Sequence, residues 1–126
     1  YIAVCSGSFD CKVGTIDAPI ARKEDSIIER CVSEAGDKAV THYEVLKNVN
    51  NYSVVKCILE TGRTHQIRVH LAHIGHPLLG DTLYGTSSPL IHRQALHAYK
   101  VKFIHPISLK SIELTAKIPN DIENII

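Results

Sequence analysis

The side chains best suited to chemistry are gathered in one stretch, Thr61–His70 (TGRTHQIRVH), which continues in a histidine-rich run to Pro77. The stretch holds two arginines, Arg63 and Arg68, and the glycine Gly62 precedes them. Glycine allows a ligand to approach the backbone closely, and arginines add fixed positive charge to the amides at the start of a helix. These residue types and their spacing favour an anion-facing turn that leads from a strand into a helix.

The period of the apolar residues predicts the helix that positions this turn, at residues 65–74. Three apolar residues fall at i, i+4 and i+7 and share one helical face: Ile67, Leu71 and Ile74. Thr64 is the expected N-cap. Gly75 stands where a helix C-terminus favours glycine, and Pro77 prevents continuation.

The helix places Arg68 about 100° from Ile67 on the wheel, at the edge of the apolar stripe rather than opposite it. A half-buried arginine in this position is suited to keep a carboxylate ionised in a poorly solvated pocket. The alternative is an arginine that closes a salt bridge with no catalytic purpose.

Two other kinds of site fit this stretch less well. His70 and His73 are three residues apart on the helix and could share a face as metal ligands, but the sequence has no H-E-x-x-H pattern and no carboxylate on the same helix to orient an imidazole. We therefore predict no metal site. Nucleophilic catalysis is also disfavoured, because the chain has no G-x-S-x-G motif and its serines have no identifiable base partner.

Length and composition predict one globular domain outside the membrane. The chain has 126 residues, of which 44% are apolar and 21% charged. It has neither an apolar run long enough to cross a bilayer nor a signal peptide, and its four cysteines form no C-x-x-C pair. These features favour a cytoplasmic protein.

Positive charge is concentrated in the middle of the chain. Residues 56–105 carry six Lys and Arg against two Asp and Glu, together with seven of the eight histidines. Such a segment can meet a phosphate backbone, because Lys and Arg replace condensed counterions there. A solvated face with a modest excess of charge is the alternative.

The remaining pattern predicts an α+β chain built around one mostly antiparallel sheet. Strands are expected at 1–6, 95–104 and 112–116, and a hairpin is expected at 39–46 and 52–61. Residues 13–20 are predicted to be an extended connector, 22–38 a loop or edge excursion, and the end of the chain a polar tail.

The sequence resembles the RluA-type pseudouridine synthases over nearly its whole length. The resemblance rests on Thr61–His70, Ile74-Gly75-His76-Pro77, Gly80-Asp81-x-x-Tyr84-Gly85, Gln94-Ala95-Leu96-His97-Ala98 and Phe103-x-His105-Pro106. Upstream, Tyr1-x-Ala3-Val4, Pro19-Ile20-x-Arg22 and Ala39-x-Thr41-x-Tyr43-x-Val45-Leu46 fit as well.

The resemblance implies an enzyme that isomerises uridine to pseudouridine in structured RNA, ribosomal or transfer RNA, without metal or organic cofactor. In this family an aspartate performs the covalent chemistry on a flipped-out uridine. Arg68 matches the arginine that pairs with that aspartate, and Tyr1 matches the tyrosine that lies against the target base. Arg63, His65 and Gln66 are expected to line the pocket or meet phosphates.

One motif of the family is absent from these 126 residues: Arg-Leu-Asp-x-x-Thr-Ser-Gly, which carries the aspartate. The chain also contains no methionine. We therefore expect residues 1–126 to be the C-terminal part of a single catalytic domain, inactive by itself. The alternative function is an RNA-binding module with no catalysis.

Overall fold

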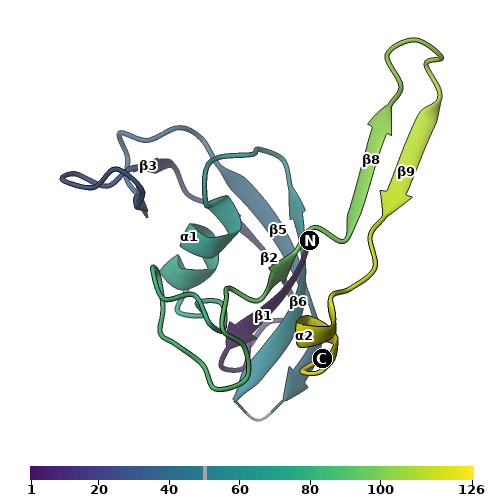
Figure 1. Ribbon diagram of the computed structural model, residues 1–126. Coiled ribbons are helices and arrows are strands. Elements are labelled where there is room, and N and C mark those ends of the chain that lie inside the picture. The colour runs from purple at the N-terminus through teal and green to yellow at the C-terminus, as the bar shows by residue number, and fades with distance from the viewer. Residues whose placement is uncertain (50) are drawn as a thin grey trace.

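The structure, a computed structural model, describes residues 1–49 and 51–126. These residues form strands and two helices (Figure 1). In chain order the elements are β1 (Ile2–Ser6), β2 (Val13–Asp17), β3 (Ile20–Arg22), β4 (Arg30–Val32), β5 (Val40–Val49), β6 (Tyr52–Leu59), α1 (Gln66–His73), β7 (Leu96–His97), β8 (Lys100–Ile104), β9 (Ser111–Thr115) and α2 (Asn120–Glu123). The pairings between these strands are antiparallel, which confirms the predicted α+β class.

The main sheet has five strands in the order β2-β5-β6-β1-β7. Two further pairs, β3 with β4 and β8 with β9, form small sheets of their own. The expectation of one sheet was therefore incomplete. Strand periodicity shows which residues are buried but not which strand lies next to which.

Helix α1 covers one face of the main sheet (Figure 1). Alternation along β1 sends Ala3 and Cys5 to this face and Val4 to the other. The core under α1 gathers Ala3, Cys5, Val55, Cys57, Ile67 and Leu71, among others. Their burial confirms that the stripe of α1 faces the sheet and that Val55 and Cys57 point inward from β6.

A smaller core lies on the opposite face of β1. Val4 packs there with Ile91 and Ala95, and with two residues from the end of the chain, Ile122 and Ile125. Ile122 is fully buried because the short helix α2 turns it toward the sheet. The predicted polar tail is thus wrong in this part. The four isoleucines of residues 117–126 stand among polar residues and Pro119, and a segment this short shows too little period to predict a four-residue helix.

The hairpin of β5 and β6 is confirmed, and β5 continues to Val49. The predicted turn at residues 47–51 includes Asn50, which lies outside the described residues. The connector predicted at 13–20 is wrong for most of its length, because Val13–Asp17 pairs with β5 as an edge strand. The loop or edge excursion predicted at 22–38 contains one strand, β4, which pairs with β3 in a two-stranded sheet outside the main one.

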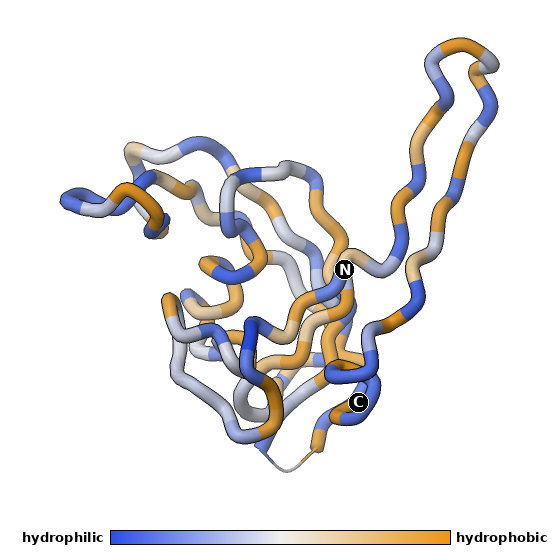
Figure 2. The backbone as a smooth tube through the Cα atoms, viewed as in Figure 1, coloured by the Kyte–Doolittle hydropathy of each residue, from blue (hydrophilic) through white to orange (hydrophobic). Residues whose placement is uncertain are grey.

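The strand predicted at 95–104 is divided between two sheets. β7 pairs with β1, whereas β8 turns away and pairs with β9. The β8–β9 hairpin extends from the body of the molecule, and hydrophobic and hydrophilic residues alternate along it (Figures 1 and 2). The predicted strand at 112–116 is confirmed as β9 within one residue.

Neither helix of the described residues is long and apolar enough to span a membrane.

Candidate functional site

The turn into α1 is closed by Gln66 rather than by Thr64. The helix begins at Gln66, its N-cap is His65 in the left-handed region (φ 57°), and no side chain caps it there. Oε1 of Gln66 accepts the N–H of Arg63 at 2.9 Å. The predicted threonine cap is therefore wrong, because a glutamine at the first helical position reaches back and satisfies a turn amide instead.

Gln66 is 3% exposed and forms all its described hydrogen bonds inside the protein. Its Oε1 also accepts from Oγ1 of Thr61 at 2.8 Å, and its Nε2 donates to O of Val40 and Oγ1 of Thr41, both at 3.0 Å. These bonds tie the turn to β5. Because Gln66 faces inward, it orders the motif, whereas Arg63 and Thr64 are exposed on the turn.

The same interior holds His70, which is fully buried. Its Nε2 donates to O of Ala18 at 2.8 Å, so Nδ1 is left to accept from Oγ1 of Thr41, also at 2.8 Å. Burial lowers the pKa of His70 below its ordinary 6.5, which favours this neutral form. Both ring nitrogens are engaged within the protein, so His70 connects α1 to its neighbours.

Arg68 forms a bidentate salt bridge with Asp81, which follows it by thirteen residues. Nε of Arg68 lies 2.9 Å from Oδ2 of Asp81, and Nη2 lies 3.0 Å from Oδ1. The Asp81 side chain is fully buried, while that of Arg68 retains 15% exposure. The predicted half-buried arginine is confirmed, and it does close a salt bridge within this chain.

The surroundings of Asp81 keep it ionised. Burial acts to raise the pKa of this carboxyl, but hydrogen bonds from Arg68 and from the N–H groups of Tyr84 and Leu83 outweigh burial and hold the pKa below its ordinary 3.8. Both amides reach Oδ1 at 3.2 Å. The carboxylate thus joins Arg68 to two backbone N–H groups of the loop that follows α1.

Tyr84 joins the salt bridge to the turn. The guanidinium carbon of Arg68 lies 5.1 Å from the centre of the Tyr84 ring, which is a cation–π contact. The phenol oxygen accepts the N–H of Arg30 at 2.9 Å and lies 2.7 Å from Nδ1 of His65. Burial and the positive charges of Arg68 and Arg30 lower the pKa of His65, so the imidazole is neutral at pH 7.

Two adjoining cavities open around this constellation and share Arg30 and Thr64. One, of about 440 Å³, is lined by Ile27, Ile28, Arg30, Thr64, His65, Arg68 and Leu83. The other, of about 410 Å³, has three arginines among its lining residues, Arg22, Arg30 and Arg63, against one carboxylate, that of Asp37. Arginines from β3, β4 and α1 therefore meet at the N-terminal end of α1, where the helix dipole is positive.

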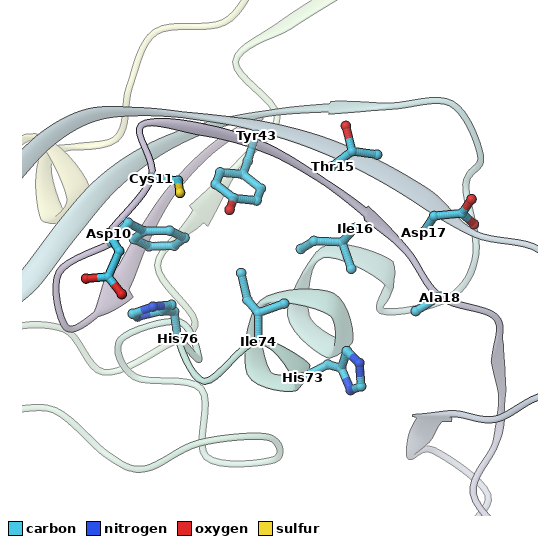
Figure 3. A pocket seen from close by; sticks show the side chains of 11 residues that line it. Asp10, Cys11, Thr15, Ile16, Asp17, Ala18, Tyr43, His73, Ile74 and His76 are labelled. Carbon is cyan, nitrogen blue, oxygen red and sulfur yellow. The ribbon is translucent and has the colours of Figure 1, made fainter.

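A third cavity, of about 400 Å³, lies at the C-terminal end of α1 and differs in charge. Its wall carries the carboxylates of Asp10 and Asp17, whereas its lining includes no arginine or lysine (Figure 3). Phe9 stacks on His76 there, with ring centroids 4.0 Å apart. The two ends of α1 thus suit ligands of opposite charge, and only the arginine-lined end suits an anion.

Tyr1 lies on the face of the main sheet that α1 covers, at the same end of that sheet as the arginine-lined N-terminal end of α1. Its carbonyl oxygen accepts the N–H of Cys57 at 2.8 Å, so the ladder of β1 and β6 continues to it. Alternation along β1 puts Tyr1 on the face of Ala3 and Cys5, which α1 covers. Because β6 ends two residues after Cys57 and leads into the turn before α1, Tyr1 stands near the start of the helix.

The structure thus brings Arg63, His65, Gln66 and Arg68 together at one helix end. Among the hydrogen bonds and ring contacts of the described residues, none joins the Tyr1 side chain to Arg68. Asp81 and Tyr84 had no predicted role, although both stand in the Gly80-Asp81-x-x-Tyr84-Gly85 motif. Their spacing from the turn gave no sign of contact; the motif itself was the only available signal.

An antiparallel α+β domain with an arginine cluster at a strand-to-helix junction belongs, by its fold and site, to the class of proteins suited to bind an anion. Comparison with known families makes the assignment specific: residues 1–73 match the family described as RNA pseudouridylate synthase. The chain belongs to this family.

Individual relatives of the chain are also named as pseudouridine synthases. The chain is 49% identical over 126 residues to a Bacillus subtilis (strain 168) protein named as the uncharacterized RNA pseudouridine synthase YjbO, covering 100% of this chain and 44% of that protein. It is 44% identical over 135 residues to the ribosomal large subunit pseudouridine synthase D of Haemophilus influenzae, covering 96% and 41%.

Among solved structures, the human RNA pseudouridylate synthase domain containing 1 superposes with a TM-score of 0.78 at 26% identity, covering 92% of this chain and 52% of that one. The chain therefore spans less than half the length of these curated relatives and about half of the solved structure.

Proposed function

We propose that residues 1–126 are the C-terminal part of one pseudouridine synthase catalytic domain, and that the whole protein isomerises uridine to pseudouridine in ribosomal or transfer RNA. The observation that carries this proposal is Arg68, held bidentately by Asp81 in the lining of a cavity that also includes Arg30, in a chain of this family. We also propose a cytoplasmic location, in line with relatives named for ribosomal RNA.

The reaction conserves atoms. The bond from N1 of the base to C1′ breaks, the base turns, and a bond from C5 to C1′ forms; C5 loses a proton and N1 gains one. We assign Arg68 to hold the reacting aspartate ionised, because an arginine paired with a carboxylate lowers its pKa. We assign Tyr1 to the target base and to movement of the C5 proton.

We assign contact with RNA to the exposed cationic side chains around the two cavities. Arg63, with its Nε donating to O of Lys38 at 2.8 Å, keeps much of its guanidinium free for phosphate. His65, Ile27 and Ile28 line the neighbouring cavity, whose mixed apolar and cationic wall suits an unstacked base beside its phosphate. We assign Gln66 an indirect role, that of holding the turn in place.

The covalent aspartate is proposed to come from outside these 126 residues. Its motif, Arg-Leu-Asp-x-x-Thr-Ser-Gly, does not occur in the sequence, and the relatives are more than twice as long. The 126-residue chain is accordingly expected to bind RNA without converting it.

The test is release of tritium from ribosomal and transfer RNA transcripts that carry [5-³H]uridine, because joining C5 to the ribose expels the C5 hydrogen. The full-length protein should release tritium and the 126-residue chain should not. Turnover by the chain alone would contradict the proposed position of the aspartate. Binding without any release by the full-length protein would favour the RNA-binding module.

A further inference from the structure

One edge of the Arg68 guanidinium is occupied by Asp81. The two parallel bonds, at 2.9 and 3.0 Å, use Nε and Nη2, which is the side-on form of the bidentate pair. The guanidinium has five N–H donors, so three remain, two on Nη1 and one on Nη2. Among the hydrogen bonds of the described residues, none uses Nη1 of Arg68.

The free edge of Arg68 has a defined direction. Tyr84 covers one face of the guanidinium with its ring, and Asp81 holds the inner edge from a fully buried position. Arg68 contributes to the lining of the cavity that also includes His65 and Leu83. The three remaining N–H groups, on Nη1 and Nη2, therefore lie on the edge of the guanidinium that a second anion can approach.

Asp81 is itself held firmly enough to fix its partner. Its Oδ1 accepts two backbone N–H groups of its own loop, those of Leu83 and Tyr84. Its carbonyl oxygen accepts the N–H of Gly85 at 2.8 Å, and Gly80 before it adopts φ +72°. Because the loop holds both the carboxylate and the backbone of Asp81, the carboxylate is a fixed partner for the arginine side chain.

We propose that Asp81 is a positioning residue of the isomerisation: it holds the Nε edge of Arg68 so that the opposite edge presents its donors to the carboxylate of the reacting aspartate. Arg68 then bridges two carboxylates, one structural and one reacting. This inference rests on the proposed function. Without Asp81, the long arginine side chain regains its rotamers and the reacting carboxylate loses a fixed partner.

A second salt bridge in the chain supplies a matched control. Arg93 and Asp121 form the same side-on pair, with Nε–Oδ2 at 2.8 Å and Nη2–Oδ1 at 3.0 Å. That pair is exposed, 41% for Arg93 and 44% for Asp121, and lies outside the cavities around Arg68. Asp121→Asn thus makes the same chemical change away from the site.

The experiment measures kcat and KM for tritium release by the full-length protein and its variants. Asp81→Asn should lower kcat about 100-fold, the scale of a small misplacement of a reacting group, while KM for RNA stays within about twofold. Asp121→Asn should retain the wild-type kcat. Asp81→Glu, which keeps the charge but displaces the carboxylate by one methylene, should also lose rate.

A double-mutant cycle shows whether Asp81 acts through Arg68. In an Arg68→Ala background, Asp81→Asn should cost nothing further in kcat. Losses that multiply, or a wild-type kcat for both Asp81 variants whatever their stability, would overturn the positioning role and leave a structural salt bridge. A wild-type protein that releases no tritium would instead overturn the proposed function, and this inference with it.

Discussion

Oγ1 of Thr41 and Nδ1 of His70 lie 2.8 Å apart, and both side chains are fully buried between β5 and α1. Since Nε2 of His70 donates to Ala18, the hydroxyl of Thr41 must donate to Nδ1. The same hydroxyl oxygen accepts from Gln66. One neutral imidazole therefore completes a chain of hydrogen bonds that fixes the helix on which Arg68 stands.

This buried histidine predicts a loss of stability in mild acid. Burial lowers the pKa of His70 in the folded protein, while the unfolded chain has the ordinary value of 6.5. Between the two values the unfolded state binds a proton that the folded state does not. The free energy of unfolding should therefore be highest above pH 6.5 and fall as the pH drops below it, as urea unfolding across this range would measure.

His70→Asn should reduce that dependence, to which His65 with its lowered pKa also contributes, and lower the free energy of unfolding by about 1–3 kcal/mol, because Thr41 or Ala18 loses its partner. The exposed His73 on the same helix is the control, and His73→Asn should change stability by no more than about 0.5 kcal/mol. An unchanged acid dependence in His70→Asn would show that another group is responsible.

Replacing Arg68 separates catalysis from binding. Arg68→Ala in the full-length protein should lower kcat by about 100- to 1,000-fold, the loss expected for a preorganised electrostatic group, while RNA affinity changes little. Arg68→Lys should also be strongly impaired, because one ammonium cannot hold two carboxylates in a planar fork. A fall in RNA affinity, measured by filter binding, with no conversion in the wild type would support a binding module.

The exposed guanidinium of Arg63 predicts a salt-dependent contribution to RNA binding. Arg63→Ala should weaken binding of all RNA sequences to a similar extent and reduce the slope of log K against log salt by about one. Titrations at several salt concentrations measure this slope. Arg93→Ala, away from these cavities, is the comparison and should leave the slope unchanged; equal slopes for all three proteins would remove Arg63 from the RNA interface.

Gly80 is required by the loop that carries Asp81. A Cβ at this position would lie 2.1 Å from the carbonyl oxygen of Arg93, and the backbone has φ +72°. Gly80→Ala should therefore destabilise the fold by more than about 2 kcal/mol and displace Asp81. Gly75→Ala has a similar φ of +88° but open space around it, so thermal unfolding should show a smaller loss there. Equal losses would mean that the positive φ, and not the contact with Arg93, causes the loss of stability.

The hydroxyl of Tyr84 connects the turn to β4 through Arg30. Tyr84→Phe keeps the ring under Arg68 but leaves the N–H of Arg30 and Nδ1 of His65 without this partner. We expect a loss of about 1–2 kcal/mol in the free energy of unfolding, together with a moderate fall in kcat. Tyr84→Leu, which also removes the cation–π contact, should be worse on both measures; if the two variants behave alike, the ring contributes nothing to holding Arg68.

The amino-acid sequence by itself determined the local elements. The i, i+4, i+7 spacing of Ile67, Leu71 and Ile74 predicted α1 within one residue at each end, and Gly75 ends the helix with a positive φ and a bond to O of Ala72. The alternation in 52–61 predicted β6 and its buried face. These predictions hold because each depends on residues within two turns or a few residues of one another.

The same reasoning put Arg68 at the edge of the apolar stripe, where it is found half-buried. It misplaced the cap at Thr64, because helix-start rules do not foresee a glutamine that satisfies the turn from inside. It also took residues 13–20 for a connector, since an edge strand with one partner shows little hydrophobic period.

Only the tertiary structure decided which groups meet. Asp81 and Tyr84 contact Arg68 although they follow it by thirteen and sixteen residues, and His70 bonds to Ala18 across the core. After β7, which pairs with β1, the chain forms a separate hairpin from β8 and β9. Periodicity records whether a residue is buried, because burial is repeated locally along an element. It does not record the partner, which depends on the path of the whole chain and on side chains that meet after the core has formed.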